Sequence, residues 1–135
     1  MIRMLRWATA LAGLASLGWL AATLESQEAR PTAVDLEAQA VKAYAAKDYA
    51  RFLELEQQAL AADPENPRWA YDVACGEALR GNAPDAVRTL NELVGRQIDF
   101  GAETDGDFAG IRQTPEWREF EARLPGLRKA VERSQ

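Results

Sequence analysis

The apolar residues between positions 34 and 95 occur at helical spacing, and the whole pattern returns after 34 residues. The matching pairs are Ala40 and Ala74, Leu53 and Val87, Leu60 and Val94, and the polar breaks Lys47-Asp48 and Gly81-Asn82. A fixed period of this length is typical of stacked helical hairpins, in which each hairpin buries its apolar face only against a neighbour. The pattern therefore predicts an all-α fold of antiparallel helical hairpins stacked as a short α-solenoid.

The first hairpin is predicted from two apolar stripes on either side of Lys47-Asp48. The first helix should run from about Val34 to Ala46, and the second should follow the polar break. The segment Asp63-Pro64-Glu65-Asn66-Pro67 then ends the second helix, because its two prolines cannot donate backbone hydrogen bonds. Pro67 also suits the first turn of the helix that follows.

The second hairpin has the clearer pattern, with Gly81-Asn82 as its turn. Its apolar residues are Trp69, Ala70, Val73, Ala74 and Ala78 before the turn, and Ala86, Val87, Leu90, Leu93 and Val94 after it. Gly95 is expected to end the fourth helix in the left-handed conformation. Small side chains at Ala40, Ala74 and Ala86 should allow the hairpins to approach closely.

The C-terminal region continues the 34-residue period with half a unit. The residues that lie 34 positions after Ala83, Ala86 and Leu90 are Trp117, Phe120 and Leu124, and all three are apolar. Thr114 is a good N-cap before Pro115, so a helix is predicted from about 115 to 124. A turn-rich stretch and the short apolar segment Phe108–Ile111 replace the partner helix. Beyond Pro125-Gly126 one more short helix is expected, so that residues 33–124 form the helical domain and residues 125–135 a C-terminal helical tail.

The chain resembles the tetratricopeptide repeat (TPR) family over residues 34–95. The residues that carry the resemblance are Ala40, Lys47-Asp48-Tyr49, Ala59-Leu60 and Asp63-Pro64 in the first unit, and Tyr71, Ala74, Gly81, Ala86, Leu90 and Leu93 in the second. Phe52 departs from the pattern where the family usually has alanine, and Glu56 departs where it prefers an aromatic residue. The tail, Asp-Gly-Asp-Phe-x-x-Ile followed by Thr-Pro-Glu-Trp, looks like the truncated closing unit of some bacterial repeat proteins.

The resemblance implies a concave surface, lined by the first helix of each hairpin, that grips an extended peptide or a partner's helix. The matching lining positions are Val34, Glu37, Val41 and Tyr44 in the first unit, and Arg68, Tyr71, Cys75 and Ala78 in the second. Among the predicted protein-binding residues Glu37, Val41, Tyr44, Arg68, Tyr71 and Ala78, the anchors would be Tyr44, Arg68 and Tyr71, since aromatic and arginine side chains dominate interface energetics. For the two tyrosines, packing between hairpins is the alternative. The lysine and asparagine set with which some family members clamp a terminal carboxylate is absent.

The first 24 residues have the composition of a targeting segment. Two arginines lie within residues 1–6, residues 7–24 carry no charge, and acidic residues follow at once. This order indicates export with the N-terminus held in the cytoplasm. The apolar run is longer than a signal core of about 7–15 residues and close to the minimum for a spanning helix, so both a cleaved signal peptide and a retained single-pass anchor are possible. Residues 25–32 form a polar linker, and the domain is expected outside the cytoplasmic membrane, periplasmic, secreted or anchored.

Composition excludes several classes of function. The net charge is −5, without a basic stripe, which disfavours nucleic acid and leaves the N-terminal segment as the only expected membrane contact. Histidine is absent and cysteine occurs once, so the chain cannot assemble a Ser-His-Asp or Cys-His site or the common zinc sites. Cys75 is interpreted as a small buried residue, with a reactive or intermolecular thiol as the alternative. No cofactor is expected.

Acidic side chains offer two further candidates. Glu103, Asp105 and Asp107 alternate as calcium ligands do, but cover only a fragment of a calcium loop, so a solvated turn that caps the segment at Phe108 is expected, with no metal site. Paired carboxylates could serve catalysis. No pair is expected in an apolar context that would shift its pKa, so the chain is not expected to be an enzyme.

These observations predict an exported TPR-like protein-protein interaction or scaffold module of the bacterial cell envelope, with a protein or peptide as partner. Two alternatives stay open. The chain could be a non-catalytic accessory subunit of an envelope enzyme, contributing a residue or a bound ion to another chain's chemistry. It could also be a structural spacer in which the tail completes the core and no groove stays open.

Overall fold

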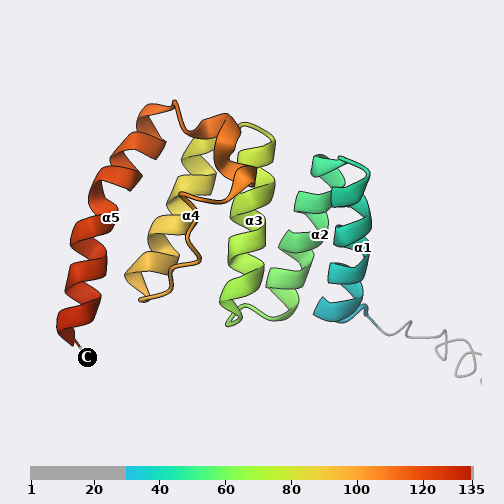
Figure 1. The fold of residues 1–135 in the computed structure, drawn as a ribbon. Coiled ribbons are helices and arrows are strands. Elements are labelled where there is room, and N and C mark those ends of the chain that lie inside the picture. The colour runs from blue at the N-terminus through green and yellow to red at the C-terminus, as the bar shows by residue number, and fades with distance from the viewer. Residues whose placement is uncertain (1–29, 135) are drawn as a thin grey trace, which may run out of the picture. The chain divides into compact units, whose positions relative to one another are not determined.

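The computed structural model describes residues 30–134, which form an all-α, repeat-like stack. Its elements are α1 (Ala33–Ala45), α2 (Tyr49–Ala62), α3 (Pro67–Leu79), α4 (Ala83–Gly95), the short 3₁₀ helix η1 (Gly106–Ile111) and α5 (Pro115–Ser134). Each α-helix packs against the next in chain order, so the five lie side by side (Figure 1). The predicted targeting segment at residues 1–24 lies outside the described residues. Among the helices of residues 30–134, none has both the length and the apolar character needed to cross a membrane.

Most of the helices begin where capping side chains satisfy free backbone N–H groups of the first turn. Thr32 accepts a hydrogen bond from the backbone N–H of Asp35 at 3.2 Å, and the Asp35 carboxylate accepts one from the Thr32 backbone at 3.0 Å. Asp48 and Asn66 each accept one from a backbone N–H 3.1 Å away at the start of α2 and α3. These contacts limit fraying at the start of α1, α2 and α3, whereas the cap residue of α4, Asn82, makes no such side-chain bond.

The 34-residue period is also present in the backbone. Lys47 after α1 and Gly81 after α3 occupy matching positions, and both are left-handed, with φ of 59° and 79°. In both turns the next residue donates its N–H to a carbonyl five residues earlier, over 2.9 Å, at Ala43 and at Glu77. These bonds satisfy carbonyls that the helix end leaves free. The two hairpins therefore end their first helices with the same device.

Small residues bring neighbouring helices together in the core. Ala40, Ala74 and Ala86 are 0% exposed. A Cβ atom at Gly76 would lie 3.0 Å from the Cβ of Leu53, which is closer than side-chain atoms normally approach. The expected close packing of the hairpins is thus confirmed, and a glycine that the pattern did not single out sets the distance between α2 and α3.

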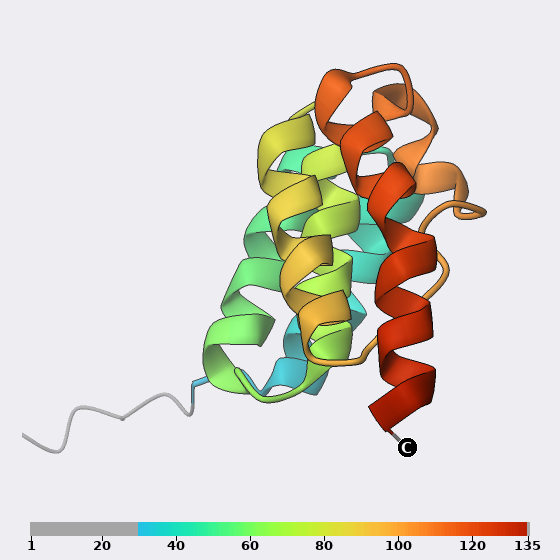
Figure 2. The same ribbon diagram turned by 90° about the vertical axis from the view of Figure 1, so that its left-hand side faces the viewer.

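The C-terminal half-unit closes the stack with aromatic side chains. The rings of Phe108 and Trp117 stack with centroids 5.4 Å apart, and Trp117 and Phe120 are 5.5 Å apart. All three are almost fully buried, as is Leu124. η1 packs against α3, and α5 runs along α4 (Figure 2). The predicted short segment followed by a buried helical stripe is confirmed, as is the cap, because Thr114 accepts from the backbone N–H three residues on, at 3.3 Å.

The predicted left-handed stop at Gly95 is wrong. Gly95 is the last residue of α4, and the left-handed residue is Gln97, with φ of 64°. Ile98 then donates its backbone N–H to Leu93 over 3.0 Å, and its side chain packs against the core. A helix of this type ends where the apolar residue that follows can return to the core, and here that residue is Ile98.

The predicted break at Pro125-Gly126 is also absent, because α5 continues through Pro125 to Ser134. The boundary expected between residues 124 and 125 therefore falls inside a helix. Tertiary contacts explain this. Leu124 is buried and Leu127 packs against the core, while Arg128 pairs with Asp99 at 2.6 Å and also with Glu103. Contacts on both sides of the proline hold the second half of the helix in place despite the lost backbone hydrogen bond.

Candidate functional site

A cleft of about 190 Å³ opens between the first hairpin, α3 and η1. The lining residues are Glu37, Val41 and Tyr44 of α1, Phe52 and Glu56 of α2, Arg68, Asp72 and Cys75 of α3, and Asp107 of η1. Converging polar groups beside apolar walls are typical of a binding site.

Four of the six residues predicted to bind a partner lie together in this cleft. Glu37, Val41 and Tyr44 share one face of α1 because they are four and three residues apart, and Arg68 faces them from α3. Val41 is 54% exposed and Tyr44 40%. Tyr44 also contacts the ring of Phe52, with centroids 5.4 Å apart, and its hydroxyl donates to Asp107 over 2.6 Å. This tyrosine both lines the cleft and ties α1 to η1.

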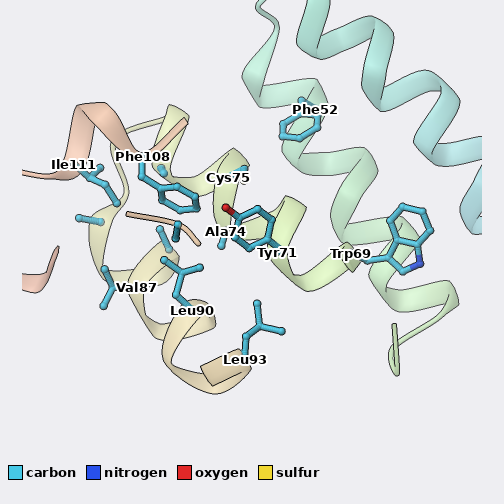
Figure 3. Close-up of a cluster of buried hydrophobic side chains, with 14 of the residues drawn as sticks. Phe52, Trp69, Tyr71, Ala74, Cys75, Val87, Leu90, Leu93, Phe108 and Ile111 are labelled. Carbon is cyan, nitrogen blue, oxygen red and sulfur yellow. The ribbon is translucent and has the colours of Figure 1, made fainter. Parts of the chain in front are cut away.

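The other two predicted residues lie elsewhere. Tyr71 is buried, projects from α3 toward Phe108, and packs 4.7 Å from the Phe100 ring centroid (Figure 3). Its hydroxyl donates to Asp105 over 2.8 Å. Ala78 is 2% exposed and belongs to the core. Tyr71 therefore packs between elements of the fold, which is the alternative to partner binding given for this residue above.

The pattern of predicted lining residues left out Phe52, Glu56, Asp72 and Asp107. For Glu56 a signal was present, because the residue 34 positions later is Leu90, which is buried in the second hairpin. A charged residue at an apolar position of a repeat marks a place where the two units differ. Asp107 comes from the irregular segment after α4, for which the repeat predicts no placement.

Two carboxyl groups in the cleft have strongly raised pKa values. Glu56 is 1% exposed, and its burial, followed by the charges of Asp72 and Glu37, raises its pKa to about 8. Burial, and next the charge of Glu37, raises the pKa of Asp72 to about 6, although Arg68 opposes the shift. The expectation that no pair of carboxylates lies in an apolar context is therefore wrong.

Arg68 is the cation of the cleft, and it lies at the rim. Its Nη2 contacts the Oε1 of Glu37 at 2.8 Å and its Nε contacts the Oδ2 of Asp72 at 3.4 Å, while its side chain is 62% exposed. The second carboxylate oxygen of Glu37 and the Oε2 of Glu56 are buried without a hydrogen-bond partner. The guanidinium of Arg68 therefore donates to only some of the carboxylate oxygens in the cleft.

Cys75 is buried at the side of the cleft near η1. Burial, with the charges of Asp105 and Asp107, raises the pKa of its thiol far above the ordinary range. One ligand atom from each of these three residues lies within 4.8 Å of the others. A protonated thiol is a poor nucleophile and a poor metal ligand, so the arrangement fits the buried structural residue that the sequence predicts.

The acidic turn after α4 is occupied by contacts within the protein. The Asp105 side chain caps η1 by accepting from the backbone of Asp107 at 3.0 Å, which confirms the predicted capping role. Asp105 and Asp107 also accept from Tyr71 and Tyr44, and Glu103 pairs with Arg128. These carboxylates are half-buried, not freely solvated.

A second, larger cleft of about 250 Å³ lies between the end of α4 and α5. Its lining residues are Val94, Gln97, Ile98, Asp99, Arg128, Val131 and Glu132. None of the predicted partner-binding residues is among them. Of its charged groups, Asp99 and Arg128 pair with each other. We therefore place the candidate site at the cleft beside α1.

Comparisons with protein-family models, with curated proteins and with solved structures found no match to this chain.

Proposed function

We propose that this chain is an exported, TPR-like interaction module that binds an extended segment of a protein partner in the cleft between α1, α2 and α3. The observation that carries the proposal is that Glu37, Val41, Tyr44 and Arg68, predicted together from the repeat pattern, line one cleft of about 190 Å³. The first helices of both hairpins contribute to this cleft, as they do to the concave surface of the family that the sequence resembles.

Exposed apolar residues support a protein partner. Val34 is 71% exposed, and Val41 and Tyr44 follow at helical spacing along α1. Apolar side chains scattered on a surface are ordinary, but here they continue from the wall of a cleft along one helix face. A peptide that enters the cleft could extend over this face.

The two alternatives predict different behaviour. An accessory subunit of an envelope enzyme would change that enzyme's activity by contributing a residue or an ion. An interaction module, in contrast, would bind its partner whether or not that partner is an enzyme. A spacer without an open groove would tolerate any soluble substitution in the cleft. The buried carboxylates, raised pKa values and unpaired acceptor oxygens favour a binding role over a spacer.

The test uses the C-terminally tagged full-length chain, purified from its own cell envelope with whatever binds it. Val41→Glu places a charge on the apolar wall of the cleft and should remove the partner. Ala38→Glu is the matched control, because Ala38 is an exposed residue of the same helix outside the cleft and gains the same charge. Quantitative mass spectrometry of the co-purified proteins measures the difference.

A stoichiometric partner that is kept by Ala38→Glu and lost by Val41→Glu supports the proposal. Equal recovery with both variants would place the interface elsewhere, and the absence of any partner would favour the spacer. The intact mass from the same purification tests export. A chain shortened by about 20–29 residues indicates a cleaved signal peptide, whereas a full-length chain recovered only in detergent indicates an anchor.

A further inference from the structure

The floor of the cleft is a set of three carboxyl groups from three helices. Glu37 of α1, Glu56 of α2 and Asp72 of α3 each bring one oxygen atom within 4.8 Å of the other two. Asp107 of η1 adds a fourth carboxylate to the lining. Among the described residues that line the cleft, Arg68 alone is cationic. The site therefore has an excess of negative charge and attracts a cation.

The buried oxygens of this cluster have too few hydrogen-bond donors when the carboxyl groups are ionised. Glu56 lines the cleft and is 1% exposed, and no other described group donates to its Oε2 or to the Oε2 of Glu37. Below its pKa of about 8, the protonated Glu56 carboxyl shares a hydrogen bond with Glu37, and once Glu56 ionises both carboxylates lose that donor. A buried acceptor without a donor is costly, and most buried polar groups in proteins are paired. Among the described residues Arg68 forms ion pairs with Glu37 and Asp72, and its charge only partly offsets the raised pKa of Glu56, with which it forms no ion pair. A donor that enters from outside would complete the set.

The shape and chemistry of the lining distinguish an ammonium group from a metal ion. A calcium ion requires six to eight oxygen ligands, whereas a primary ammonium has three donors for three acceptors. The guanidinium of Arg68 lies 2.8 Å from Glu37 and would repel a divalent charge more strongly than a single one. The walls formed by Val41, Tyr44 and Phe52 are apolar and suit a methylene stem below a charged head.

We propose that the cleft binds a lysine side chain from the extended segment of the protein partner, with its ammonium on Glu37, Glu56 and Asp72 and its methylene stem against Val41 and Tyr44. This inference rests on the proposed function, and it adds the chemistry that selects the partner. Arg68 moves aside or shares Glu37 and Asp72 with the incoming ammonium, which its exposed position at the rim allows.

Binding should depend on pH in a defined direction. The groups that act on Glu56 are Glu37 of α1 and Arg68 and Asp72 of α3. The same cleft is also lined by the titratable side chains of Tyr44, Cys75 and Asp107. The pKa of Glu56 is about 8 and that of Asp72 about 6, so both carboxyls become better acceptors as the pH rises through these values. A lysine ammonium stays charged up to about pH 10. The dissociation constant should therefore fall at least about tenfold between about pH 6 and about pH 8.5.

The experiment titrates the isotope-labelled chain, as recovered from the envelope, with an acetylated and amidated Ala-Ala-Lys-Ala-Ala peptide, and follows amide shifts by NMR. The control peptide carries norleucine, which keeps the methylene stem but lacks the ammonium. Saturable shifts in α1, α2 and α3 with the lysine peptide alone support the inference. Glu56→Leu and Asp72→Asn should each weaken binding at least about tenfold, whereas Glu54→Gln, on the exposed face of α2, should leave it unchanged.

Several outcomes would overturn the inference. Equal shifts with the norleucine peptide would mean that the ammonium is not recognised, and saturable binding of Ca²⁺ alone at the same amides, without binding of the lysine peptide, would make the cluster a metal site. Unchanged affinity in both cleft variants would place the peptide elsewhere. If the lysine peptide fails while Val41→Glu still loses the natural partner, the lysine inference fails and the proposed function stands.

Discussion

The two hairpins share a backbone plan but differ in what their second helices bury. Position 56 of α2 is a glutamate, and the matching position 90 of α4 is a leucine, although both side chains are at most 3% exposed. Phe52 of α2 likewise matches Ala86 of α4. Both residues of α2 line the cleft. They are also the two departures from the TPR pattern, so the places where the first hairpin breaks the repeat are the places where the candidate site is built.

The second hairpin follows the regular pattern and is covered by the closing unit. α3 contacts η1 and α4 contacts α5, so apolar residues of this hairpin gain aromatic neighbours such as Phe108. The second hairpin is therefore packed between apolar neighbours on both sides, whereas the first hairpin supplies two of the carboxyl groups of the cleft, Glu37 and Glu56. The comparison indicates that stability depends mainly on the second hairpin and the proposed binding on the first.

The largest effect is expected from the closing unit. Trp117→Ala removes a fully buried ring that contacts Phe108 and Phe120, so it should lower the free energy of unfolding by about 3–5 kcal/mol. Urea denaturation followed by circular dichroism measures the loss. A loss below about 1 kcal/mol would show that the closing unit contributes little to the stability of the stack. It would contradict the conclusion that stability depends mainly on the second hairpin and its cover.

A smaller effect tests whether the hairpins approach their neighbours equally closely. Ala74→Leu should overpack its site and destabilise the fold by about 1–3 kcal/mol. Ala40→Leu is the matched variant, since Ala40 occupies the same position of the first unit and is also 0% exposed. Similar losses in thermal or urea unfolding would confirm equivalent packing. A loss at Ala74 alone would mean that the first hairpin is more loosely packed.

Replacing the buried glutamate by its counterpart should stabilise the protein. The folded state holds the proton of Glu56 up to about pH 8, while the ordinary carboxyl pKa is 4.5. The contribution of Glu56 to stability is therefore greatest below pH 4.5 and is lost as the pH rises from 4.5 to about 8. Glu56→Leu removes this dependence, so it should raise the free energy of unfolding by about 1–2 kcal/mol above pH 8 and by less near pH 5. Urea unfolding at the two pH values checks the sign, and a gain that is larger at the lower pH would contradict the account.

The smallest effect concerns the left-handed turns. Gly81→Ala forces a side chain into a conformation with φ of 79° and should cost about 1 kcal/mol. Lys47→Gly should stabilise by up to about 1 kcal/mol, because Lys47 adopts the same region at a strain that glycine avoids. Thermal unfolding of the two single variants gives opposite shifts in Tm. Shifts of the same sign would show that the matching turns are not equivalent.

The fold was largely predictable because its helices pack through apolar residues that recur at a fixed period. The 34-residue period locates Ala40 and Ala74 in the core, and its projection places Trp117 there as well. The exceptions arise from contacts made after the local pattern ends. Ile98 returns to the core and moves the helix stop beyond Gly95, and Arg128 holds α5 beyond Pro125.

The candidate site was predictable only where it lies on the first helices. Glu37, Val41 and Tyr44 follow from helical spacing on α1, and Glu56 could have been found by comparing it with Leu90. Asp107 could not, because it is 63 residues away from Tyr44, to which it bonds, and lies on an irregular segment. The raised pKa values depend on burial in three dimensions, which no single helix pattern reports.

The closing unit covers the stack after two hairpins, and this limits the length of the partner segment that the protein can bind. η1 and α5 cover the second hairpin, where a longer array would add another unit. Neighbouring helices are about 10 Å apart, so a surface running from α1 past α3 to η1 extends for about 20 Å. An extended chain advances about 3.3 Å per residue, so such a surface would accommodate about six residues. Recognition would then be that of a short linear motif, in which a few well-placed side chains determine the choice of partner.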